Sequence, residues 1–150
     1  MATTRRSRAL AASPEKVWRT TGDPQQLARW WPKVVRVEGL SGGHFTEVLQ
    51  TERGRDMRAD WVVVEELACE HWRAVQELQG TPFERVLAHA EKAVTLQPAG
   101  EGTLVTLELR RRMRGLSRLG GVFLRKASSL QLDSALDALE SIYGANAVNR

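Results

Sequence analysis

Alternation of apolar and polar residues with a period of two runs through most of the chain after residue 32 and predicts a series of β-strands. The clearest case is the segment 57–65, where an apolar face alternates with a charged one. Short turn signals rich in Gly, Pro and Ser separate the segments. The expected strands cover residues 3–12, 33–40, 45–53, 57–65, 71–78, 83–97 and 103–113. The segment 83–92 has a helix-favouring composition, and we assign it to a strand because its flanking turns are of hairpin size.

Two short helices are predicted between the first two strands. Ser13 can cap a helix that begins with Pro14, because a missing N–H suits the first helical turn. Asp23-Pro24 repeats this chemistry, and Pro32 ends the second helix. The predicted helices therefore cover residues 14–20 and 24–31.

The hydrophobic period changes to that of an amphipathic α-helix over residues 119–143. The apolar stripe consists of Leu124, Leu132, Ala135, Leu139 and Ile142, and charged residues lie opposite: Lys126, Asp133, Asp137 and Glu140. This helix is the one predicted element long enough to cover a large sheet.

These elements predict an α+β fold with one domain over residues 1–150. A curved antiparallel sheet of about seven strands would wrap around the long C-terminal helix, with two short helices after the first strand. A curved sheet that grips one helix leaves space between them, and we expect a ligand cavity there.

Several motifs resemble those of the START-like, Bet v 1-like (SRPBCC) superfamily, in particular its bacterial polyketide cyclase/dehydrase and lipid-transport branch. They lie at residues 12–18, 23–24, 27, 30–32, 77–83 and 96–106. The resemblance implies the helix-grip fold and a small hydrophobic ligand. It says little about activity, because these motifs are caps and turns and one fold hosts many functions.

The composition of the chain limits the partners and the cellular compartment that we expect. The formal net charge of +4 comes mostly from arginine and does not by itself indicate nucleic acid. Cys69 is the single cysteine, which rules out an intrachain disulfide and fits a reducing compartment. No apolar run approaches a membrane span and no signal peptide is recognisable, so we expect a cytoplasmic protein.

Candidate ligand-binding residues lie on the apolar faces of the predicted elements. Trp61 and Trp72 are expected in the middle of neighbouring strands, where an indole either stacks on a planar ligand or fills the core. Of the tryptophans that end the second helix, we expect Trp31 to face the pocket and Trp30 to be partly exposed. Polar residues on apolar faces need a partner that a ligand can supply. The full candidate set is Trp31, Trp61, Trp72, Gln76, Lys92, Ser128, Gln131 and Ala135.

An enzyme would need a general acid or base, and no catalytic residue can be assigned from the sequence. The candidates are Asp60, His71, His89, Glu91 and Tyr143. Strand parity places the first four opposite the most apolar faces, which favours a solvated role for them. The three histidines lack metal-ligand spacing, so neither a metal nor another cofactor is expected.

Three function classes remain open. The leading hypothesis is binding or transport of a small hydrophobic molecule, by a monomer or homodimer without specific nucleic-acid binding. The second is an aromatic polyketide cyclase or dehydratase, which a polar dyad inside the pocket would favour over a wholly apolar one. The third is a protein or RNA interaction module that uses the arginine run at 110–114.

Overall fold

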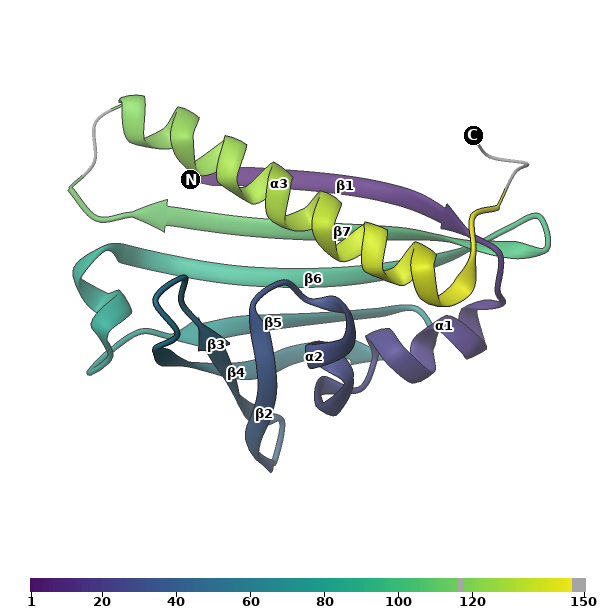
Figure 1. Ribbon diagram of the computed structural model, residues 1–150, viewed down its shortest axis with the longest axis horizontal. Coiled ribbons are helices and arrows are strands. Elements are labelled where there is room, and N and C mark those ends of the chain that lie inside the picture. The colour runs from purple at the N-terminus through teal and green to yellow at the C-terminus, as the bar shows by residue number, and fades with distance from the viewer. Residues whose placement is uncertain (116–117, 147–150) are drawn as a thin grey trace.

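The computed structural model describes residues 1–115 and 118–146. Seven antiparallel strands form one curved sheet in the order β1-β7-β6-β5-β4-β3-β2 (Figure 1). The strands are β1 (Ala2–Leu10), β2 (Val34–Ser41), β3 (His44–Gln50), β4 (Asp56–Leu67), β5 (His71–Glu77), β6 (Leu87–Ala99) and β7 (Gly102–Met113). The first strand thus pairs with the last, and the remaining strands follow one another as a meander. The predicted α+β helix-grip architecture is confirmed.

The helices near the N-terminus form where the capping residues predict them. The side chain of Ser13 accepts a hydrogen bond from the Lys16 N–H at 3.3 Å, at the start of α1 (Pro14–Thr21). Asp23 caps the second start in the same way, through the Gln25 N–H at 3.0 Å. The second predicted helix consists of a 3-10 turn, η1 (Pro24–Gln26), followed by one α-helical turn, α2 (Leu27–Trp30).

The long helix α3 (Arg118–Tyr143) crosses the concave side of the sheet over β1 and β7 (Figure 1). The middle of its apolar stripe is buried, with Leu132 and Leu139 fully inaccessible to solvent, whereas Leu124 and Ile142 near its two ends are half-buried. Its polar side reaches β1, where Arg8 Nη1 lies 2.5 Å from Asp137 and 3.0 Å from Glu140. Within the described residues, the helices are too short or too polar to cross a membrane.

The strand expected over residues 83–97 is wrong at its beginning. Residues Pro82–Arg85 form a 3-10 turn, η2, since Pro82 occupies its first turn and the Val86 N–H bonds back to the Phe83 carbonyl. The strand begins at Leu87, with a register shift between Leu87 and His89 in its pairing to β7. Because of this shift, Leu87 is buried while Val86 is 49% exposed.

Candidate ligand site

A cavity of about 250 Å³ lies inside the grip, between the sheet and α3. Its lining includes half-buried Phe83 and Leu124 and exposed Val86, so the cavity is not closed off from solvent. We call this space the inner cavity. Its described lining residues are Trp31, Glu47, Leu49, Ala59, Trp61, Gln76, Phe83, Val86, Leu87, Lys92, Leu109, Arg111, Met113, Leu124 and Gln131.

A buried ion pair lies on the wall of the inner cavity. Lys92 on β6 and Glu47 on β3 are only 1% and 2% exposed, and the ammonium nitrogen donates a hydrogen bond to Glu47 Oε2. Strands β5 and β4 lie between these two strands in the sheet. The side chains therefore meet because the sheet curves strongly enough to bring β3 and β6 across the concave side.

Two indole rings surround the same ammonium group. Lys92 Nζ lies 4.3 Å from the ring centroid of Trp31 and 4.4 Å from that of Trp61, within the range of cation–π attraction. Burial lowers the pKa of Lys92 below its ordinary value, and the charge of Arg111 lowers it further. The charge and hydrogen bond of Glu47 oppose this shift.

A second cation lies in the inner cavity. Arg111 donates a hydrogen bond from Nη2 to Gln131 Oε1 on α3 at 2.8 Å. Burial lowers the pKa of Arg111, and the Glu47 charge acts in the opposite direction. Lys92, Arg111 and Glu47 are the charged residues among the described lining residues, so two cations face one carboxylate.

Hydrogen-bond donors also outnumber acceptors around the cavity. Trp61 Nε1 and Gln76 Nε2 are buried, and neither has a hydrogen-bond partner in the described part of the chain. The two residues lie directly opposite each other on β4 and β5. A buried donor without a partner costs about 1–3 kcal/mol, which an acceptor atom of a ligand can offset after a small side-chain rotation.

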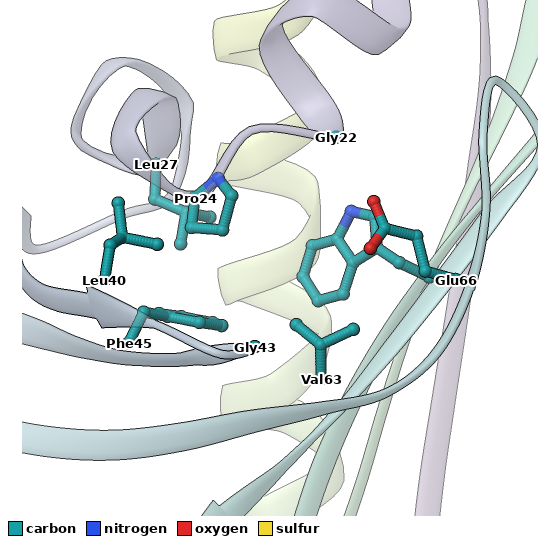
Figure 2. A pocket seen from close by; sticks show the side chains of 9 residues that line it. Gly22, Pro24, Leu27, Leu40, Gly43, Phe45, Val63 and Glu66 are labelled. Atoms are coloured by element: carbon teal, nitrogen blue, oxygen red, sulfur yellow. The ribbon is translucent and has the colours of Figure 1, made fainter.

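A second pocket, of about 190 Å³, is bordered by Trp72 and is here named the outer pocket. Figure 2 shows Pro24 and Leu27 across from Phe45 and Val63, with the Glu66 carboxylate at one side. Glu66 is the one charged residue among its described lining residues. Trp72 is held in place because its Nε1 donates to the Thr21 carbonyl at 2.6 Å.

The structure divides the predicted ligand residues into three groups. Lining the inner cavity are Trp31, Trp61, Gln76, Lys92 and Gln131. Trp72 lines the outer pocket instead. Ser128 and Ala135 are buried residues of α3 but are not among the residues that line either pocket. The expectation that Trp30 is partly exposed is wrong, because it is 2% exposed and packs edge-on against Trp31.

The candidate acids and bases do not line the inner cavity. Asp60 accepts a hydrogen bond from Thr46 at 2.6 Å, and His71 and His89 pair with Glu65 and Glu91 at 3.1 and 3.2 Å. The remaining candidate, Tyr143, bonds to Thr20 and to the Lys16 carbonyl at the end of α3. In residues 1–115 and 118–146, no three His, Cys, Asp or Glu side chains gather as a metal site would require.

Strand parity divides the arginine run between the two faces of the sheet. Arg111 lines the inner cavity, whereas Arg110 lies 3.4 Å from Glu91 on the opposite face of the sheet. Arg114 Nε donates to the Glu84 carbonyl at 2.9 Å and so holds η2 against the end of β7. The run therefore does not form one continuous basic surface.

Glu47 and Arg111 are the charged cavity residues that the predicted ligand set does not contain. Both could have been found from strand parity. Glu47 shares its face with Phe45 and Leu49, and Arg111 continues the inward series that ends at Leu109. A charged residue on the apolar face of a strand was the available signal.

Comparison with known proteins agrees with this architecture. The model of the family described as polyketide cyclase / dehydrase and lipid transport matches residues 1–143. No curated protein sequence matches the chain. A START superfamily protein from Mycobacterium smegmatis is 15% identical, with a TM-score of 0.77 over 95% of this chain and 97% of that one.

Two further solved structures share the fold. The protein XoxI from Bacillus cereus is 17% identical, with a TM-score of 0.76 over 95% of this chain and 96% of the other. The di-domain ARO/CYC BexL from the BE-7585A biosynthetic pathway is 19% identical, with a TM-score of 0.78 over 94% of this chain and 46% of that one. With the family model matching nearly its whole length, the chain belongs to the polyketide cyclase / dehydrase and lipid transport family.

Proposed function

We infer that the inner cavity binds a small, mainly apolar molecule that carries one carbonyl or carboxylate group. The observation that carries this proposal is the charge inventory of the lining, in which Lys92 and Arg111 face the single carboxylate of Glu47. A bound carboxylate would balance the surplus cation, and the oxygen of either group would accept hydrogen bonds from donors that lack partners. The indoles of Trp31 and Trp61 would contact the apolar part of the molecule.

The size of the inner cavity favours a compact ligand. Its volume of about 250 Å³ lies just below the ~300–1,000 Å³ of common ligand pockets. Roughly eight water molecules would fill it at about 30 Å³ each. A molecule of one or two rings fits this space, whereas a two-chain phospholipid does not.

A cyclase or dehydratase is the second candidate function, and one observation favours it. The inner cavity contains a polar dyad, Lys92 with Glu47, in contact with aromatic walls. An ammonium group can stabilise an enolate, and the neighbouring carboxylate can exchange a proton with it. Two proteins with a similar fold are described as ARO/CYC.

Native mass spectrometry of the purified protein, followed by denaturing extraction, tests the proposal. We expect one small molecule per chain, and titration with benzoate should show saturable binding that Lys92→Met weakens. Trp72→Phe, which alters the outer pocket, is the matched control and should leave benzoate binding unchanged. Saturable binding that depends on Trp72 and not on Lys92 would contradict the proposal.

A further inference from the structure

We propose that Lys92 forms a Schiff base with a small aldehyde or ketone bound in the inner cavity, with Glu47 as the proton carrier. This inference rests on the proposed function, since the carbonyl compound must first enter the cavity. It adds a covalent step that binding alone does not require.

The position of Lys92 distinguishes it from the other lysines. The chain has four, and Lys16, Lys33 and Lys126 are exposed whereas Lys92 is 1% exposed. An amine that is removed from water loses part of its preference for the charged form and becomes a nucleophile at lower pH. The amine also borders a cavity large enough to hold a reacting molecule.

The surroundings of Lys92 suit the product as well as the free lysine. A protonated Schiff base keeps one positive charge on the same nitrogen, so the attraction to Glu47 and to both indole rings remains after reaction. Conversion of the ammonium into an iminium ion therefore leaves no buried charge without a partner.

Glu47 can supply every proton transfer that the step needs. It takes a proton from the Lys92 ammonium, and the free amine attacks the carbonyl carbon to form a C–N bond. Glu47 returns this proton to the alkoxide oxygen and then removes a second proton from the nitrogen. It passes that second proton to the hydroxyl group, which leaves as water. The balance is one carbonyl compound and one ammonium giving one iminium and one water, and Glu47 ends as the carboxylate.

The walls of the inner cavity favour the condensed product. Trp31, Trp61 and Leu109 enclose the reacting nitrogen in a mainly apolar space. Loss of water from the adduct is favoured where little bulk water is present to reverse it. An aromatic aldehyde fits these walls best because its ring can pack against the indoles.

Reductive trapping of the wild-type protein tests the proposal without any substitution. The protein is incubated with benzaldehyde and sodium cyanoborohydride at neutral pH, digested, and mapped by mass spectrometry. We expect a single benzyl group on Lys92, formed at least about tenfold faster than on any exposed lysine, because burial leaves more of this amine uncharged and the inner cavity holds the aldehyde beside it. The N-terminal amine has its own reactivity and is scored separately. Benzylation that favours the exposed lysines and spares Lys92 would overturn the proposal.

Two variants separate the covalent step from simple binding. Glu47→Gln should slow trapping at Lys92 by about tenfold or more, in the range of a lost general acid–base. Lys33→Arg should change nothing. Benzoate cannot form an imine, so quenching of tryptophan fluorescence by benzoate reports binding alone. Benzoate binding without trapping would refute the Schiff base and retain the proposed function, whereas loss of both would refute both.

Discussion

The two faces of the same sheet hold their charges in different ways. On the outer face, Arg73 bridges Glu91 at 2.8 Å and Glu108 at 3.3 Å, and its side chain is 22% exposed. On the inner face, Lys92 and Glu47 pair at 1% and 3% side-chain exposure. Arg73 of the outer network stays in contact with water although its two carboxylate partners are only 10% exposed, whereas both members of the inner pair are removed from water.

The difference in exposure indicates what the outer network and the inner pair each contribute to the protein. A partly exposed network costs less to form than a fully buried pair and also gains less, because water still solvates its central cation, Arg73, in the folded state. A buried pair carries a desolvation cost of several kcal/mol per ion, which its mutual attraction only partly offsets. The inner pair is therefore poorly explained by stability alone, and ligand chemistry in the cavity accounts for it better.

Breaking the inner pair should have the largest effect on stability. We expect Glu47→Gln to lower the free energy of unfolding by about 3–5 kcal/mol at neutral pH, because it leaves the Lys92 ammonium buried without a counter-charge. The loss should shrink as the pH rises toward 10.5, the ordinary pKa of a lysine. In that range the unfolded chain binds more protons than the folded one, so stability rises with pH. Urea unfolding across this range measures the effect, and a loss independent of pH would contradict the assignment.

Replacing both members of the inner pair should not lower the free energy of unfolding and can raise it. We expect the double variant Lys92→Met with Glu47→Leu to be neutral or more stable by about 1–4 kcal/mol, since apolar side chains of similar volume avoid the desolvation cost. The same variant should lose benzoate binding. A double variant that is as unstable as Glu47→Gln would show that the pair has a structural role.

Removing Arg73, the central cation on the outer face, should lower the free energy of unfolding by a smaller amount. We expect Arg73→Ala to lower the free energy of unfolding by about 1 kcal/mol, with a smaller loss at high salt. Benzoate binding should be unchanged, because Arg73 lies on the opposite face from the inner cavity. Thermal unfolding at two ionic strengths measures this, and an effect as large as that of Glu47→Gln would remove the contrast between the faces.

The smallest effect should come from titration of the outer network. Burial raises the pKa of Glu91, but hydrogen bonds from Arg73 and His89 and the charges of Arg73 and Arg110 outweigh it, so the pKa lies below its ordinary 4.5. Glu91 therefore contributes stability above pH 4.5 that is lost as the pH falls through its folded-state pKa. Glu91→Gln should make the decline of the melting temperature in acid less steep. An unchanged decline would show that Glu91 is not one of the groups responsible.

The fold was predictable because its signals are local. Ser13 and Asp23 cap helices through neighbours two or three residues away, and the alternation in β4 and β7 follows from strand geometry. The start of β6 was not predictable in this way. The composition of residues 83–92 favours a helix by propensity, and the shift at Leu87 depends on pairing with β7.

The site was predictable only in part, because it depends on how strongly the sheet curves and which distant strands this brings together. Lys92 and Gln76 were recognisable as polar residues on apolar faces. Their partners were not, since Glu47 lies 45 residues from Lys92 and three strands away. Strand parity also places Trp72 on the inner side without telling which pocket it borders, and that depends on where α1 and η1 pack.

The most direct test of the inner cavity as the binding site uses the indole N–H signals of the five tryptophans in nitrogen-15 NMR spectra. Benzoate is added to the labelled protein, with signals assigned by single Trp→Phe variants. We expect the signals of Trp31 and Trp61 to shift in a saturable way while that of Trp72 stays in place. A shift confined to Trp72, or no saturable shift at all, would contradict the account.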